Sequence, residues 1–315
     1  MSLAFVFPGQ GSQSIGMLNA FYESYPQIKK TYDQASSVLD YDLWDIITFG
    51  PGEKLNSTDV TQPAMLAAGV AIWSLWNEKN GKQPSMMAGH SLGEYTALVC
   101  AGVIEFKQAI KLVSSRGKYM QEAVPKGTGA MAAILGLDDD SVREVCSAAS
   151  TADTDGNKKV VAAVNFNSPG QVVIAGHTHA VEMATKKAKE NGAKRAIILP
   201  VSVPSHCPLM KPAADKLAAD LQAITFSVPS IPVINNVDVK TETSADAIKE
   251  ALVRQLYQPV RWVEIVQSMV SQGVDHILEC GPGKVLWGLN KRIDKSLVHA
   301  ALIDSAAMDS QISSD

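Results

Sequence analysis

The pentapeptide Gly89-His90-Ser91-Leu92-Gly93 constrains the fold of this chain more than any other segment. It matches the G-x-S-x-G pattern, in which a serine occupies a strained turn between a strand and a helix. An apolar segment over 85–88 precedes it, and a helix-forming segment over 92–101 follows. We therefore expect an α/β fold with Ser91 exposed at the tip of the turn. The pentapeptide alone also fits an ordinary strand–helix turn with a capping serine.

A nucleophilic serine needs a base, and the chain contains six histidines. His206 has the most suitable setting, because it follows a strand-like segment and a loop with prolines and precedes an expected helix near residue 212. His90 is expected to point away from the tip of the turn. The other histidines are expected at a helix start or in structural positions within apolar strands: His177, His179, His276 and His299.

Residues 128–200 predict a small subdomain with a sheet of its own. Apolar alternation and turn residues order it as strand, helix, strand, strand, helix, strand, which is the ferredoxin-like pattern. The remaining segments, 1–127 and 201–305, predict a large α/β-hydrolase-like subdomain around it. Its strands, near 3–7, 85–90, 231–236 and 275–280, are separated by helices, which favours a largely parallel sheet. Residues 306–315 are expected to form a polar, mobile tail.

Charge and cysteine usage exclude several classes of function. The net charge of −4 argues against nucleic acid as the main partner. The four cysteines show no zinc-like spacing and suit a reducing cytosol, so neither a metal nor a redox cofactor is expected. No signal peptide is visible, and the longest apolar stretch, near 64–76, is too short to span a membrane. We expect a cytoplasmic protein, and nothing demands more than a monomer.

Seven segments form an ordered set of motifs: 5–13, 89–95, 115–117, 165–171, 203–206, 255–262 and 279–286. Together they resemble the malonyl-CoA:acyl carrier protein transacylases, the stand-alone enzymes of type II fatty acid synthesis. The resemblance runs from about residue 3 to about residue 303, which is nearly the whole chain. It implies two subdomains with the active site in the cleft between them.

The resemblance implies a ping-pong reaction through a malonyl-serine ester. Ser91 attacks malonyl-CoA with His206 as its base, and the phosphopantetheine thiol of acyl carrier protein then takes the malonyl group. The backbone N–H groups of Gln10 and Leu92 form the oxyanion hole, because Leu92 begins a helix and the glycines beside Gln10 let the main chain approach closely.

The resemblance also implies a Ser–His dyad in place of a triad. A backbone carbonyl near Gln255 would orient His206, since any acceptor for the ring N–H suffices. Gln255 itself corresponds to an active-site position of the family. From the residues alone, Asp238 or Glu279 remains open as a triad acid, and Gln255 also fits an exposed helix position.

Arg116 carries the implied choice of substrate. Malonyl differs from acetyl by a free carboxylate, which a guanidinium binds bidentately, so the resemblance makes Arg116 the carboxylate clamp. Met120 lies one helical turn later and fits either the acyl pocket or the core. Acyl carrier protein is acidic, so basic residues near the cleft are expected to dock it. Lys194 and Arg195 are the first candidates, because they lie close to the strand leading toward His206.

Three other functions remain open. A serine hydrolase or thioesterase would use the same nucleophile, although a missing triad acid disfavours it. An acyltransferase for another acyl group, such as methylmalonyl, would keep the same dyad. A non-catalytic binding role would be expected to have lost Ser91 or His206, and both are present. Cys207 is a weak alternative nucleophile, because neither an elbow nor a helix N-terminus is evident for it.

Overall fold

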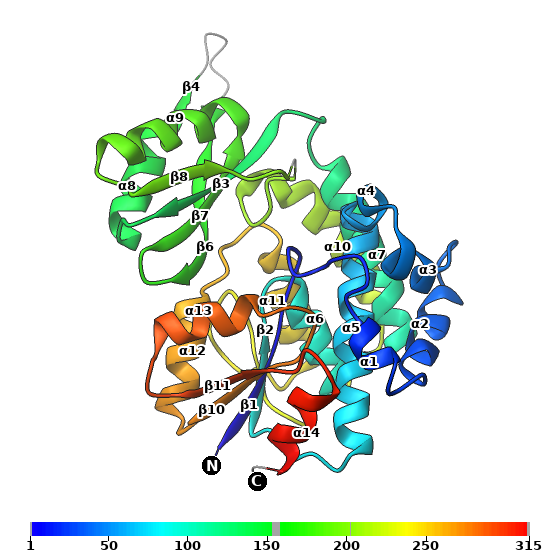
Figure 1. The fold of residues 1–315 in the computed structure, drawn as a ribbon. Coiled ribbons are helices and arrows are strands. Elements are labelled where there is room, and N and C mark those ends of the chain that lie inside the picture. Colours follow the sequence, from blue (N-terminus) through cyan, green and yellow to red (C-terminus); the bar gives the residue numbers. More distant parts are fainter. Residues whose placement is uncertain (1, 153–157, 202, 314–315) are drawn as a thin grey trace.

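The computed structural model describes residues 2–152, 158–201 and 203–313, and it shows a large and a small subdomain (Figure 1). The large subdomain holds a five-stranded sheet of order β11-β10-β1-β2-β9, in which each neighbouring pair is parallel. Its strands are β1 (Leu3–Phe7), β2 (Met86–Gly89), β9 (Val233–Ile234), β10 (His276–Glu279) and β11 (Val298–Ala301). The predicted parallel α/β sheet is confirmed, and β11 adds an edge strand.

Helices cover both faces of this sheet, because β1 is apolar and buried at every position (Figure 1). Leu3, Phe5 and Phe7 pack in one core with α5 (Thr58–Glu78), α6 (Leu92–Cys100) and α7 (Phe106–Glu122). Ala4 and Val6 pack in a second core with α12 (Trp262–Ser271) and α13 (Val285–Ile293). None of the helices in the described ranges has both the length and the apolarity to cross a membrane. The helices of the large subdomain are α1 (Asn19–Tyr22), α2 (Ile28–Ser36), α3 (Leu43–Phe49), α4 (Gly52–Leu55), α5 (Thr58–Glu78), α6 (Leu92–Cys100), α7 (Phe106–Glu122), α10 (Lys211–Gln222), α11 (Ala245–Gln255), α12 (Trp262–Ser271), α13 (Val285–Ile293) and α14 (Ser305–Ser313).

The small subdomain has an antiparallel sheet of order β6-β7-β3-β8, with two helices packed against one face. The order of its elements confirms the predicted ferredoxin-like pattern. A short hairpin of β4 (Thr151–Ala152) and β5 (Lys158–Lys159) precedes β6. The main elements are β3 (Gly129–Leu135), α8 (Asp139–Ala149), β6 (Val161–Ser168), β7 (Gln171–His177), α9 (Thr178–Glu190) and β8 (Arg195–Ile198).

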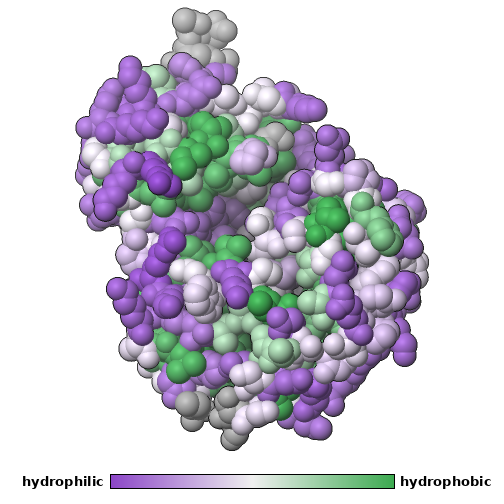
Figure 2. All heavy atoms as spheres, viewed as in Figure 1, coloured by the Kyte–Doolittle hydropathy of each residue, from purple (hydrophilic) through white to green (hydrophobic). Residues whose placement is uncertain are grey.

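Two sets of hydrogen bonds join the subdomains beside the recess that Figure 2 shows between them. The chain around Val260 lies along β6, where the Phe166 N–H donates to the Val260 carbonyl at 3.0 Å and the Val260 N–H donates to the Val164 carbonyl at 2.8 Å. Closer to the elbow, His90 Nε2 lies 2.8 Å from Asn167 Oδ1. Backbone and side-chain hydrogen bonds therefore both join the two subdomains.

Helix α14 replaces the mobile polar tail that the sequence predicts over 306–315. Met308 is fully buried, Ile312 packs against the large core, and Asp309 forms a salt bridge with Lys79 at 2.8 Å. The two apolar residues are four positions apart and so lie on one helical face. Two apolar positions in a polar segment are too weak a pattern to predict this helix. Residues 314 and 315 lie outside the described part of the chain.

Candidate active site

Ser91 lies between β2 and α6 with φ 52° and ψ −109°, a conformation that non-glycine residues rarely adopt. The flanking glycines make this turn possible: a Cβ on Gly89 would lie 1.8 Å from the Gly93 carbonyl carbon, and one on Gly93 would lie 2.0 Å from the Phe7 oxygen. Asn236 holds the turn in place, because its Oδ1 accepts the Ser91 N–H at 2.7 Å and its Nδ2 donates to the Gly89 carbonyl at 2.7 Å. The predicted elbow is thus a strained, tightly held turn.

His206 is 3% exposed and lies beside the elbow serine, with its Nε2 2.8 Å from Ser91 Oγ. Its Nδ1 lies 2.6 Å from the Gln255 carbonyl oxygen, which only accepts, so Nδ1 carries the proton and Nε2 is the acceptor. Burial, together with the positive charge of Arg116, lowers the pKa of His206 to about 3. The ring is therefore neutral at pH 7 and able to take the serine proton.

The two candidate triad acids have other partners. Asp238 accepts hydrogen bonds from the Arg254 guanidinium, with Nη1 at 2.8 Å from Oδ1. Glu279 accepts the backbone N–H groups of Leu286 at 3.1 Å and Trp287 at 2.7 Å, at the start of α13. The acceptor for the His206 ring N–H is instead the backbone carbonyl of Gln255.

The turn around Gln10 lies directly against the elbow. A Cβ on Gly9 would lie 2.5 Å from the His90 carbonyl oxygen and 3.7 Å from Leu92 N, so only glycine allows this approach. Leu92 is the first residue of α6, and Gln10 is exposed at its turn. The structure therefore brings Gly9, the neighbour of Gln10, against the elbow and the N-terminus of α6.

Arg116 is a buried cation next to the nucleophile. It is 1% exposed, and its guanidinium donates from Nη1 to Gln62 Oε1 at 2.8 Å and from Nη2 to Gln255 Oε1 at 3.0 Å. Nη2 also lies 3.4 Å from Ser91 Oγ, and the Tyr95 ring packs against the group with its centroid at 5.2 Å. Burial lowers the pKa of Arg116, yet a guanidinium stays charged. Among the described residues, its Nε has no hydrogen-bond partner and no carboxylate forms a salt bridge with it.

The sequence assigned no role to three buried polar residues around this cation and the elbow: Gln62, Glu94 and Asn236. Gln255, which also fitted an exposed helix position, is fully buried, and its Nε2 donates to the Ser91 carbonyl at 3.0 Å and to Glu94 Oε2 at 2.8 Å. One signal was available: Gln62 and Glu94 are polar residues within otherwise apolar helices, which predicts a buried polar partner.

The remaining predicted residues differ in their distance from this network. Met120 is 2% exposed, and its Sδ lies 3.5 Å from Gln62 Nε2, which places it beside Arg116. Lys194 and Arg195 are exposed at the start of β8, in the small subdomain, whereas the elbow lies in the large one. Cys207 is buried, and burial raises the pKa of its thiol to about 12, so it is not a thiolate at pH 7.

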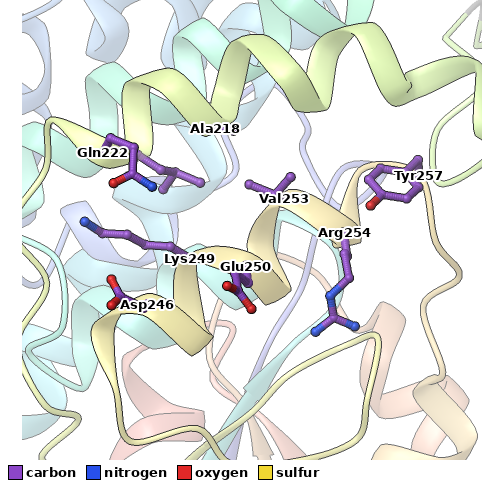
Figure 3. Close-up of a pocket in the computed structure, with 9 residues that line it drawn as sticks. Ala218, Gln222, Asp246, Lys249, Glu250, Val253, Arg254 and Tyr257 are labelled. Carbon is purple, nitrogen blue, oxygen red and sulfur yellow. The ribbon is translucent and has the colours of Figure 1, made fainter.

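Two further observations concern a separate pocket and possible metal ligands. A pocket of about 460 Å³ lies between α10 and α11, lined mainly by surface side chains such as Gln222, Lys249, Glu250 and Tyr257 (Figure 3). None of the residues around Ser91 lines it, although it shares α11 with Gln255. Within the described residues, no group of three His, Cys, Asp or Glu side chains is arranged to hold a metal ion.

Comparison with known proteins gives the family. Residues 4–301 match the acyl transferase domain, and the chain is 60% identical to the malonyl CoA-acyl carrier protein transacylase of Escherichia coli K12 over 97% of both chains. The chain belongs to the acyl transferase family, among the malonyl CoA-acyl carrier protein transacylases. An acyl carrier protein S-malonyltransferase from Vibrio cholerae superposes with a TM-score of 0.95 at 58% identity, covering 98% of this chain and 99% of the other.

A second solved acyl transferase bears on partners. It is a malonyl-transacylase in complex with its holo type II PKS acyl-carrier protein, and it superposes with a TM-score of 0.97 at 58% identity over 100% of both chains. Membership of the acyl transferase family makes this chain an acyltransferase. The strained serine, the neutral histidine and the buried arginine described above lie within the matched residues 4–301.

Proposed function

We propose that the protein transfers the malonyl group from malonyl-CoA to the phosphopantetheine thiol of acyl carrier protein, through a malonyl ester on Ser91, in fatty acid biosynthesis. The observation that carries this proposal is the buried Arg116 guanidinium beside the Ser91 hydroxyl. A buried cation without a salt-bridge partner among the described residues suits a substrate that brings its own carboxylate. Malonyl-CoA carries such a carboxylate next to the thioester that Ser91 would attack.

In the first half-reaction, Ser91 Oγ attacks the thioester carbonyl and His206 Nε2 takes the serine proton. The negative charge on the tetrahedral oxygen is stabilised by the backbone N–H groups of Gln10 and Leu92. The C–S bond then breaks, His206 gives its proton to the departing thiolate, and CoA leaves. The Gln255 carbonyl stabilises the protonated histidine, because it accepts the Nδ1 proton throughout.

In the second half-reaction, the thiol of acyl carrier protein attacks the malonyl-Ser91 ester. His206 takes the thiol proton, the ester C–O bond breaks, and the proton passes back to Ser91. The Arg116 guanidinium holds the malonyl carboxylate in both halves, while Gln62 and Gln255 hold the guanidinium. Met120 lies beside Gln62 and would form part of the wall around the short acyl chain.

We place the carrier protein on the small subdomain at the start of β8. Lys194 and Arg195 are exposed there, and they are followed by Ile197 and Ile198, each 47% exposed. Figure 2 shows hydrophobic side chains on this subdomain above the recess. A basic edge next to an apolar patch complements an acidic partner that also buries apolar surface.

The arrangement also favours a particular setting for the protein. The four cysteines, Cys100, Cys146, Cys207 and Cys280, are all free, which fits a reducing compartment such as the cytoplasm. Every group of the proposed site comes from one chain, so a monomer would suffice for the reaction.

Intact mass measurement after mixing with malonyl-CoA tests the proposal. We expect a malonyl adduct on the wild type, none on Ser91→Ala, and loss of the adduct when holo acyl carrier protein is added. Release of free CoA without an adduct would contradict the transferase and favour a hydrolase. A stable adduct that the carrier protein does not remove would contradict the second half-reaction alone.

A further inference from the structure

Glu94 is a buried carboxylate under the nucleophile. It lies on the first turn of α6, three residues after Ser91, and is 2% exposed. Its Oε2 accepts the Asn236 backbone N–H at 2.9 Å and Gln255 Nε2 at 2.8 Å. Within the described part of the chain, no cationic side chain forms a salt bridge with it. A charge in this position needs a reason, because burial disfavours it and its bonds are made with neutral donors.

The Gln255 amide separates this carboxylate from the arginine. Its Nε2 donates to Glu94 Oε2 and to the Ser91 carbonyl at 3.0 Å, while its Oε1 accepts Arg116 Nη2 at 3.0 Å. The reversed amide would set an NH₂ group against the guanidinium and an oxygen against two acceptors. Glu94 and the Ser91 carbonyl together therefore select the orientation that turns the acceptor toward Arg116.

The Gln255 amide between Glu94 and Arg116 also explains why the arginine can still bind a substrate carboxylate. A direct Arg116–Glu94 pair would use the guanidinium donors and neutralise the cation before substrate arrives. With Gln255 between them, the guanidinium donates to a neutral amide oxygen, and its Nε stays without a hydrogen-bond partner among the described residues.

We propose that Glu94 is a positioning residue for substrate selection: it orients the Gln255 amide so that Arg116 is held ready for a free carboxylate. This inference rests on the proposed malonyl transfer and deepens it. Glu94 touches neither the substrate nor the reacting atoms. Its removal should impair acyl donors that carry a carboxylate and spare those that do not.

The test uses the full-length protein at pH 8, because burial raises the pKa of Glu94 to about 7 and the group is then ionised. Two acyl donors are compared: malonyl-CoA, followed as the malonyl adduct by quenched intact mass, and p-nitrophenyl acetate, which acylates Ser91 without a carboxylate. The variant is Glu94→Met, which keeps the length and removes the acceptor. The matched control is Thr96→Val on the same helix, since Thr96 is 1% exposed and its Oγ1 has no partner among the described residues.

For Glu94→Met we expect the second-order rate constant for malonyl loading to fall about 10-fold, as for loss of a buried hydrogen bond to a charged group. The rate constant for p-nitrophenyl acetate should fall much less than that for malonyl loading, the small loss coming from the Asn236 N–H that Glu94 also accepts. Both values for Thr96→Val should stay within about twofold. In an Arg116→Ala background, Glu94→Met should cause no further loss of malonyl loading, because its effect passes through Arg116.

Equal losses with both acyl donors would overturn the proposal, as would a malonyl-specific loss that persists without Arg116. If Glu94→Met does not fold, Glu94→Asp replaces it: this variant keeps the charge but withdraws the acceptor from Gln255, and it should show the same selective loss in smaller measure. No malonyl adduct on the wild type would instead overturn the proposed function, and this inference with it.

Discussion

Arg116 and Ser91 are in contact, with Nη2 of the guanidinium 3.4 Å from the serine Oγ. The cation is thus within reach of any acyl group attached to this serine, and its distance suits an acyl group whose carboxylate lies a few bonds from the ester. In the proposed reaction, selection of the substrate depends on this contact more than on Ser91 and His206, because any accessible thioester could acylate the serine.

Arg116→Ala should separate substrate selection from nucleophilicity. We expect malonyl loading to fall about 100-fold, because truncating one partner of a buried charge pair costs about 2–5 kcal/mol. Acylation by p-nitrophenyl acetate should change little, since Ser91 and His206 remain in place. Arg116→Lys is the control that keeps the charge but loses the bidentate fork, and it should fall between the two. Equal loss with both donors would show that Arg116 supports the elbow rather than the carboxylate.

The pH dependence of acylation should lack the inflection of an ordinary histidine. The pKa of His206 is lowered to about 3, so the ring stays neutral and basic as the pH falls from 8 to 5, whereas a histidine of pKa near 6.5 would become protonated in that range. The rate of acylation by p-nitrophenyl acetate, measured in buffers of constant ionic strength, should therefore stay within about twofold over this interval. A decline centred near pH 6.5 would contradict the buried, neutral state of the ring.

Charge reversal at the start of β8 should affect only the second half-reaction. For Lys194→Glu with Arg195→Glu, we expect discharge of the malonyl adduct by holo acyl carrier protein to slow about 10-fold, more at low salt than at high salt. Loading from malonyl-CoA should be unchanged. The same charge change at Lys29 and Lys30 on α2 is the control. Slowing of both half-reactions, or of neither, would place the docking surface elsewhere.

Two glycine substitutions should have opposite effects on stability. In Gly93→Ala the new Cβ would lie 2.0 Å from the Phe7 carbonyl oxygen, so the elbow must open or the protein must fail to fold. In Gly288→Ala, within α13, nothing lies within 4 Å of the new Cβ. This variant should gain about 0.5–1 kcal/mol, the usual difference between alanine and glycine inside a helix. Urea denaturation measures both, and a stable, active Gly93→Ala protein would contradict the tight turn.

The sequence predicted most of the fold because its signals were local. The strand before Ser91, the turn glycines and the order of elements in the small subdomain are patterns within a few residues of one another. Helix α14 was not predicted, because the burial of Met308 in the large core and the salt bridge between Asp309 and Lys79 both involve distant parts of the chain. The weak edge strand β11 likewise depends on its partner β10.

The residues of the candidate site that belong to sequence motifs were predicted. Those that reach the site only through tertiary packing were missed. Ser91, His206 and Arg116 lie in recognisable segments, and the structure brings all three together. Gln62 comes from α5, 54 positions before Arg116. Its place in a largely apolar helix predicts a buried polar partner but does not indicate which residue that partner is. The orientation of the Gln255 amide depends on the Ser91 carbonyl and Glu94 at the start of α6 and on Arg116 from α7, so only the folded structure shows it.

Both members of the dyad have a positive φ, 52° at Ser91 and 64° at His206. Such backbone conformations cost a non-glycine residue roughly 1–3 kcal/mol each. Glycine would relieve that cost at either position, but it would also delete the hydroxyl or the imidazole. Thermal stability and turnover are therefore opposed at these two positions. A Ser91→Gly protein should unfold at a higher temperature than the wild type but transfer no acyl group. A heat-resistant form that still transfers acyl groups must therefore keep Ser91 and His206 and be stabilised at other positions.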